Sequence, residues 1–222
     1  MATRMVLIRH GETDWNAKGL IQGDSDLSRL NANGIRQCKR LALKVSKMRI
    51  DAAYASPLTR AADTAKAIVP AGMPIIKTKR LRERHFGSIE GLGFDRFIRG
   101  DKQRWQTWRE SRELPEVKDV ETVEHLQARA MQAVIAIAKG NRNKTVLVVT
   151  HGAFIRYLLA KALKLPFSLI SELNPANCSV NVIEFNGQVR ESGMQVMSIN
   201  GRRVPKRLSR NRKLLSSANN PP

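Results

Sequence analysis

Short apolar runs alternate with helical segments along most of this 222-residue sequence. An apolar run of about four to eight residues between turn signals indicates a buried strand, whereas apolar residues three and four apart indicate one face of a helix. This pattern predicts strands at 5–8, 51–55, 74–76, 145–149, 179–184 and 194–199, and helices at 30–48, 56–69, 121–139 and 153–163. Ser56, which Pro57 follows, is predicted to cap the helix over 56–69. Such alternation predicts an α/β fold, a three-layer α/β/α sandwich on a mainly parallel sheet.

The composition is that of an ordinary globular protein, with 42% hydrophobic and 26% charged residues. No apolar run approaches the roughly 18 residues that span a bilayer. Cys38 and Cys178 are the only cysteines, which argues against a disulfide framework and favours a reducing compartment. A cleavable presequence would remove the first strand and the histidine that follows it. We therefore expect a cytoplasmic protein, with the nucleus as an alternative, and not a secreted one.

Positive charge is the strongest compositional bias, with a formal net charge of +20. Seven basic residues and no acid follow Gly201, namely Arg202, Arg203, Lys206, Arg207, Arg210, Arg212 and Lys213. We predict one domain over 1–200, with 92–117 as an excursion over the active site, and a basic, disordered tail over 201–222. The tail is either a solubilising extension or a contact for a polyanion such as RNA, DNA or an anionic membrane surface.

Residues that can bind anions follow three of the predicted strands. They are Arg9 and His10 after the first strand, Ser56 and Arg60 after the second, and His151 after the strand over 145–149. In open α/β sheets, the loops at the carboxyl ends of the strands converge on the ligand. A glycine follows each of these two histidines, which permits close approach of backbone and ligand. We expect these side chains to meet in one crevice.

The residue types at these strand ends suit phosphoryl transfer. That reaction is accelerated mainly by positioning and by cations around the phosphoryl oxygens. Arginine matches phosphate geometry and stays charged, and a neutral imidazole is a competent nucleophile. A carboxylic acid is then required to protonate the leaving oxygen and to activate water. The sequence therefore predicts hydrolysis of phosphate esters through a phosphorylated histidine.

Four blocks resemble the histidine phosphatase (phosphoglycerate mutase-like) superfamily, and the resemblance covers roughly residues 5–199. The blocks are Leu7-Ile8-Arg9-His10-Gly11-Glu12-Thr13-Asp14-Trp15-Asn16, then Ser56-Pro57-Leu58-Thr59-Arg60-Ala61, then Leu81, Glu83, Gly87, Glu90 and Gly91, and finally Val148-Val149-Thr150-His151-Gly152. Weaker matches include Gln22-Gly23, Arg129 and Asn177.

The resemblance implies a role for each matched residue. His10 would be the phosphorylated nucleophile and Glu83 the proton donor. The phosphoryl group would be held by Arg9, Asn16, Arg60 and His151. Gln22 and Gly23 would form the rim around the organic part of a phosphorylated small molecule. The resemblance implies no metal and no other cofactor.

Departures from the family pattern favour a phosphatase over a mutase. Phe86 stands where mutases typically carry tyrosine, Glu90 matches the phosphatase pattern, and residues 26–30 are one residue longer than usual. Phosphoglycerate mutase activity is one alternative, and a nucleic-acid or ribonucleoprotein-associated scaffold that uses the basic tail is another. A metal site built from both strand-end histidines and Glu83 is a third, and Glu12 or Glu90 could replace Glu83 as the acid. Substrate identity and oligomeric state are left open.

Overall fold

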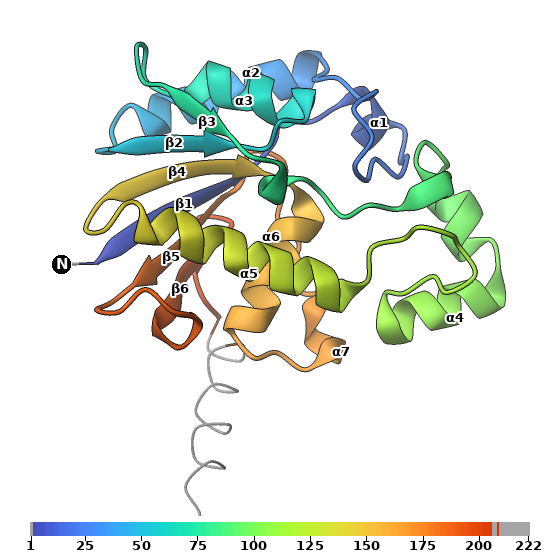
Figure 1. Cartoon of the computed structure of the whole chain (residues 1–222). Coiled ribbons are helices and arrows are strands. Elements are labelled where there is room, and N and C mark those ends of the chain that lie inside the picture. The colour runs from blue at the N-terminus through green and yellow to red at the C-terminus, as the bar shows by residue number, and fades with distance from the viewer. Residues whose placement is uncertain (1, 206–207, 209–222) are drawn as a thin grey trace, which may run out of the picture.

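A computed structural model describes residues 2–205 and residue 208, and within them the strands form one seven-stranded sheet (Figure 1). The strands are β1 (Thr3–Arg9), β2 (Ala52–Ala55), β3 (Ile75–Lys77), β4 (Thr145–Thr150), β5 (Val180–Phe185), β6 (Met194–Ile199) and β7 (Arg202–Arg203). Their order across the sheet is β3-β2-β4-β1-β5-β6-β7. The neighbours β1, β4, β2 and β3 pair in parallel. β5 is antiparallel to β1, and β6 is antiparallel to β5, so β6 again runs in the direction of β1. The sheet is therefore mixed and mainly parallel.

Seven α-helices accompany the sheet in the described residues. They are α1 (Asp14–Ala17), α2 (Ala32–Val45), α3 (Thr59–Ile68), α4 (Lys102–Ser111), α5 (Val123–Lys139), α6 (Gly152–Ala162) and α7 (Phe167–Ile170). Shorter turns are η1 (Lys79–Leu81), η2 (Gly87–Ile89), η3 (Asp95–Arg99) and η4 (Glu191–Gly193). In Figure 1, α2 and α3 cover one face of the sheet and α5 and α6 the other. The predicted three-layer α/β fold is confirmed.

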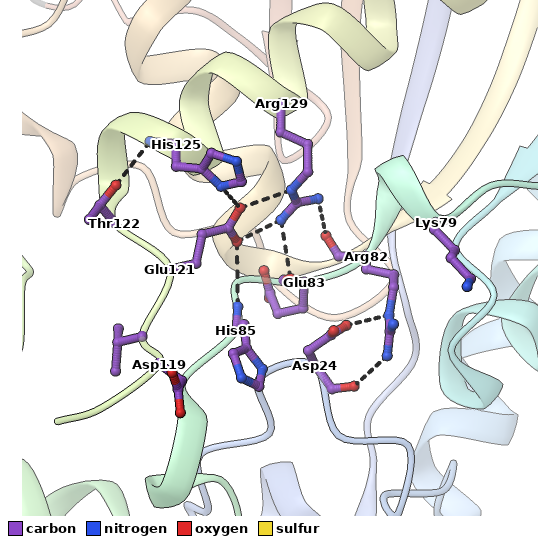
Figure 2. Close-up of a pocket in the computed structure, with 11 residues that line it drawn as sticks. Asp24, Lys79, Arg82, Glu83, His85, Asp119, Glu121, Thr122, His125 and Arg129 are labelled. Atoms are coloured by element: carbon purple, nitrogen blue, oxygen red, sulfur yellow. Dashed lines mark hydrogen bonds and ion pairs between the residues drawn. The ribbon is translucent and has the colours of Figure 1, made fainter.

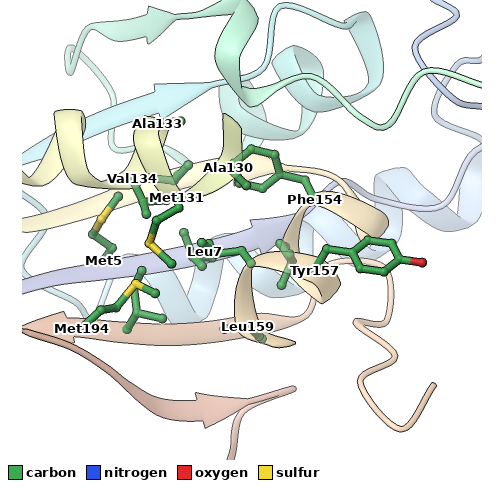
Figure 3. Packing of buried hydrophobic residues seen from close by; sticks show 14 of the residues in the cluster. Met5, Leu7, Ala130, Met131, Ala133, Val134, Phe154, Tyr157, Leu159 and Met194 are labelled. Carbon is green, nitrogen blue, oxygen red and sulfur yellow. The ribbon is translucent and has the colours of Figure 1, made fainter. Parts of the chain in front are cut away.

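The central strand β1 is apolar from Met5 to Ile8, where both of its faces are covered. Met5 and Leu7 belong to a core cluster with residues of α5 and α6, whose packing is drawn in Figure 3. Val6 and Ile8 point to the opposite face and pack with residues of α2 and α3. Because side chains alternate across a strand, this continuous run supplies both cores at once.

The start of α3 differs from the sequence prediction. Ser56 was expected to cap this helix, but α3 begins at Thr59 and Ser56 does not precede it directly. The Asp26 carboxylate accepts hydrogen bonds from the backbone N–H and the hydroxyl of Thr59, at 2.6 and 2.8 Å. A loop 33 residues away therefore satisfies the helix start, which leaves the Ser56 hydroxyl for another partner.

Two further segments bear on the sequence predictions. Residues 94–111 hold η3 and α4, and Ile98 and Trp108 form a third apolar cluster there with Ile21. Of the predicted disordered tail over 201–222, the structure describes residues 201–205 and 208, and Arg202–Arg203 pair with β6 as β7. The rest of the tail lies outside the described residues, so its disorder and its polyanion contacts stay predictions. In the described part of the chain, no helix is long and apolar enough to cross a membrane.

Candidate active site

The carboxyl ends of β1 and β4 bring the two strand-end histidines together. The His10 N–H donates to the Thr150 carbonyl at 3.0 Å, which extends the pairing of the two strands by one residue. The His10 and His151 rings lie with their centroids 5.3 Å apart at an interplanar angle of 59°. Both side chains are buried. The convergence of these two residues follows directly from adjacent parallel strands.

The His10 ring is oriented by the loop that follows it. Its Nδ1 lies 2.7 Å from the Gly11 carbonyl oxygen, which can only accept a hydrogen bond. The proton of the neutral ring therefore sits on Nδ1, and Nε2 keeps its lone pair. Burial, together with the charges of Arg60 and Arg9, holds the pKa of His10 well below its ordinary value of 6.5. The ring is thus a neutral imidazole with an available nucleophilic nitrogen at neutral pH.

His151 is held by the residue that was expected to cap α3. Its Nε2 lies 2.8 Å from the Ser56 hydroxyl, and its buried Nδ1 has no hydrogen-bond partner among the described residues. Burial and the nearby charge of Arg60 hold the pKa of His151 well below 6.5. With the Ser56 hydroxyl donating to Nε2, the neutral ring presents an Nδ1–H donor that a ligand can accept from.

Two buried guanidiniums, Arg9 and Arg60, accompany the histidines. Arg60 donates through Nη1 to the Ser25 carbonyl at 2.6 Å and through Nη2 to the Gly23 carbonyl at 2.7 Å. Arg9 donates through Nη1 to the Pro175 carbonyl at 2.8 Å, and burial lowers its pKa to about 10. Both remain charged at neutral pH. The Nε of each is buried without a partner in the described structure, so each has a donor left for an anion.

Asn16 is oriented by residues on both sides of it. Its Oδ1 accepts from the Thr13 N–H at 3.2 Å and from the Asn177 amide, also at 3.2 Å. The same Asn177 amide donates to the His10 carbonyl at 3.0 Å. Since the Asn16 oxygen is occupied, its Nδ2 is the group available to the cavity. Asn177 was only a weak match in the sequence, and the structure places it as the link between His10 and Asn16.

The Glu83 side chain, from the loop after η1, contacts the first turn of α6. Its carboxylate accepts from the backbone N–H groups of Ala153 and Phe154 at 2.9 and 3.0 Å. Arg129 holds the segment that carries it by donating to the carbonyls of Arg82 and Glu83, at 2.9 and 3.3 Å (Figure 2). Two elements distant in sequence, α5 and α6, therefore fix the position of this carboxylate.

A cavity of about 290 Å³ joins these groups. Its polar lining comprises Arg9, His10, Asn16, Gln22, Arg60, Glu83 and Arg156. Glu83 is the only acid among the lining residues of the described chain, whereas the Glu12 carboxylate is engaged by Asn31 and Asn33. Arg156 also lines the cavity, although no sequence pattern indicated it. It lies on α6, one turn beyond the His151-Gly152 pair. A larger cavity of about 560 Å³ adjoins this one at Glu83 but contains neither strand-end histidine (Figure 2).

Gly23 shapes the rim of the 290 Å³ cavity. Its φ is +50°, and a Cβ there would lie 2.1 Å from Oε1 of Glu90. That same Glu90 oxygen accepts from the backbone N–H groups of Asp24 and Phe86, at 2.8 and 2.9 Å. Glycine is therefore required at this position, because a side chain would displace the carboxylate that ties the rim loop to the segment after Glu83. Gln22 also lines the cavity, and its Oε1 accepts from the Ser28 hydroxyl at 2.9 Å.

The low pKa values of His10 and His151 predict that stability falls in acid. Unfolding returns both rings to the ordinary pKa of about 6.5, so below that pH the unfolded chain binds more protons than the fold. The contribution of the two rings to the free energy of unfolding is therefore complete above pH 6.5. It declines as pH falls, by up to about 1.4 kcal/mol per pH unit for each ring. Urea unfolding between pH 8 and pH 5 in phosphate-free buffer measures this. The double variant His10→Asn/His151→Asn should show a shallower decline, and an equal decline would contradict the assignment.

The described residues contain no group of three or more His, Cys, Asp or Glu side chains placed to hold a metal ion. The metal site considered from the sequence, with both histidines and Glu83, therefore finds no counterpart in the described part of the fold. The groups that converge instead are three guanidiniums, two neutral imidazoles, two amides and one carboxylate. Such a set binds an oxyanion beside a nucleophile.

Comparisons with known proteins agree with this fold. A family model of the histidine phosphatase superfamily (branch 1) matches residues 5–194. The chain is 36% identical over 194 residues to a metal-independent phosphoserine phosphatase of Arabidopsis thaliana, which covers 84% of this chain and 78% of that protein. It is 32% identical over 182 residues to a probable phosphoglycerate mutase of Serratia proteamaculans, covering 82% and 84%. The crystal structure of a phosphoserine phosphatase mutant from Entamoeba histolytica, in complex with phosphoserine, superposes with a TM-score of 0.78 at 28% identity, covering 90% of this chain and 97% of that one.

The fold and the site define an α/β protein in which a cavity lined by arginine side chains lies beside a buried, neutral histidine. The chain belongs to branch 1 of the histidine phosphatase superfamily. Its relatives in that family include both phosphatases and phosphoglycerate mutases.

Proposed function

We propose that this protein is a phosphatase that hydrolyses phosphomonoesters, without a metal ion, through a phosphohistidine on His10. One observation carries the proposal. Three buried nitrogens have no hydrogen-bond partner in the described structure, namely Arg9 Nε, Arg60 Nε and His151 Nδ1. Arg9 and Arg60 line the same cavity as His10, whose Nε2 is free, and the His151 ring lies 5.3 Å from the His10 ring. Buried donors are almost always satisfied in native proteins, so three vacancies in one place favour an anionic ligand there.

Each residue then has a role in two steps. Nε2 of His10 attacks phosphorus, the N–P bond forms, and the P–O bond to the alcohol breaks while the Glu83 carboxyl gives its proton to the leaving oxygen. Water then attacks phosphorus, its proton passes to the Glu83 carboxylate, and phosphate leaves as the N–P bond breaks. Arg9, Arg60, His151 and the Asn16 amide hold the phosphoryl oxygens, and Gln22 and Gly23 border the organic part of the substrate.

The proposed phosphoenzyme can be trapped directly. The protein is mixed with 4-nitrophenyl phosphate in the presence of a chelator, quenched in alkali within milliseconds to seconds, and analysed by peptide mass spectrometry. Because a phosphoramidate survives alkali and hydrolyses in acid, we expect a phosphoryl group on the peptide of His10 that acid treatment removes. Phosphate release without any label on His10, or turnover only after a divalent cation is restored, would contradict the proposal.

The same experiment separates a phosphatase from a mutase. For a phosphatase, free phosphate equals the nitrophenol released even when 3-phosphoglycerate is added as an acceptor. A mutase would instead transfer the phosphoryl group of the phosphoenzyme to that acceptor, so a bisphosphorylated product would form at the expense of free phosphate. Phosphoserine, which is bound in the related Entamoeba structure, is included as a candidate substrate in the same assay.

A further inference from the structure

Six of the side chains that line the 290 Å³ cavity are apolar. They are Leu20, Ile21, Phe86, Phe94, Ile98 and Trp108. All but Leu20 belong to the third apolar cluster, so they form one continuous wall between the rim loop and the excursion over 92–117. Ile21, Ile98 and Trp108 are buried in the structure.

The wall is rigid, because rings and a buried cation support it from behind. Trp108 contacts the ring of Phe86 with centroids 6.1 Å apart, and it meets Phe94 edge to face at 5.8 Å. The guanidinium of Arg84 lies 5.1 Å from the centroid of Phe86 and 5.9 Å from that of Trp108. Aromatic pairs and cation–π contacts of this kind hold ring orientations. The apolar surface is therefore present before any ligand binds.

The polar residues that line the cavity are not part of the third apolar cluster. Arg156 donates through Nε to the Leu173 carbonyl at 2.6 Å and through Nη2 to Asn174 at 2.9 Å. Its charge contributes to the lowered pKa of Arg9, and both residues line the cavity. Gly19 also lines the cavity and, as a glycine, adds no polar side chain to it.

We propose that this cavity selects phosphomonoesters of aromatic or similarly apolar alcohols over those of polyols and amino acids. This selection rests on the proposed function, in which His10 and the polar lining residues bind and cleave the phosphate ester. A ring placed against the wall gains apolar burial and edge or stacking contacts. The hydroxyl, amino or carboxylate groups of a polar ester would lose water at this wall without finding partners. An apolar cavity of about 150 Å³ accommodates benzene, so about 290 Å³ leaves space for a ring and a phosphoryl group.

Ligand binding tests this selection without requiring turnover. Isothermal titration of the full chain compares benzylphosphonate with 2-hydroxyethylphosphonate, which carry the same anionic group and cannot be hydrolysed as esters. We expect benzylphosphonate to bind about ten- to a hundredfold more tightly, with a negative heat-capacity change from apolar burial. Equal binding, or tighter binding of the polar phosphonate, overturns the proposal.

Two phenylalanines of the same segment provide a matched pair of variants. Phe94 lines the cavity, whereas Phe97 is half-buried like it but packs against Arg104, with the guanidinium 4.2 Å from the ring centroid. Phe94→Leu should weaken the binding of benzylphosphonate about five- to tenfold and leave the binding of the polar phosphonate unchanged. Leucine loses the contact between aromatic rings but fills most of the volume of phenylalanine. Phe97→Leu should leave the ratio of the two affinities unchanged. If both variants lower the ratio equally, the wall is not the selecting surface and the proposal fails.

The experiments distinguish failure of the proposed phosphatase function from failure of the proposed selection by the apolar wall. Tight, selective binding of benzylphosphonate without hydrolysis of any phosphomonoester would refute the proposed function and leave the assignment of the wall intact. Hydrolysis of phosphoserine at a kcat/KM equal to or above that of phenyl phosphate would refute the aromatic selection and leave the phosphatase assignment intact.

Discussion

His10→Asn is expected to lower kcat for phenyl phosphate by about 10⁴- to 10⁶-fold, the range seen when a catalytic nucleophile or its partner is removed from a hydrolase. Asparagine keeps a polar side chain of smaller size but has no nitrogen lone pair that can attack phosphorus. Ligand affinity should change far less than kcat, because the guanidiniums of Arg9 and Arg60 and the His151 ring remain in place. Steady-state phosphate release and phosphonate titration measure the two effects separately.

A control for this variant lies on α5. His125 is exposed, with 69% of its side chain accessible, and it pairs with Glu121 outside the 290 Å³ cavity. His125→Asn should therefore leave kcat within about twofold, since surface substitutions away from a site have small effects. A His10→Asn protein that folds normally and retains more than a tenth of the parent rate would show that His10 is not the nucleophile.

Arg84→Met is expected to lower the free energy of unfolding by about 3–5 kcal/mol, the range for removal of one partner of a buried charged pair. The guanidinium of Arg84 is fully buried and donates to the carbonyls of Glu121 and Arg112 and to the Glu113 carboxylate, each at 2.6 Å. Methionine fills much of the volume but leaves these three acceptors without their donor. Urea denaturation measures the loss, and benzylphosphonate titration measures the loosening of the wall that Arg84 supports.

Arg99→Met is the matched control for Arg84→Met. Arg99 also contacts aromatic rings, but its side chain is 57% exposed and its partner Asp95 is 78% exposed. Because solvent screens such a pair, its loss should cost no more than about 1 kcal/mol. Equal destabilisation by the two variants would show that Arg84 does not join the excursion to the core.

The elements of the fold could be predicted from the sequence because they depend on neighbours a few residues apart. The apolar run before Arg9 and the run before His151 identify strands, and adjacent parallel strands deliver both histidines to one edge. The family blocks added Glu83 and Asn16, and the structure places both, together with Arg60, at the same cavity as His10. The function proposed for these residues stays a prediction until the phosphoenzyme is tested.

The sequence by itself therefore determined the α/β fold, the family and the residues that gather around His10. Only the tertiary structure decided which of their atoms are free. Ser56 has the sequence context of a helix cap, yet its hydroxyl contacts His151, 95 residues away, because Asp26 already serves the start of α3. Likewise, no local pattern shows that Arg84 is buried or that Trp108 lines the cavity. These outcomes depend on packing between distant segments, because a buried polar group favours a partner that can lie far away in the sequence.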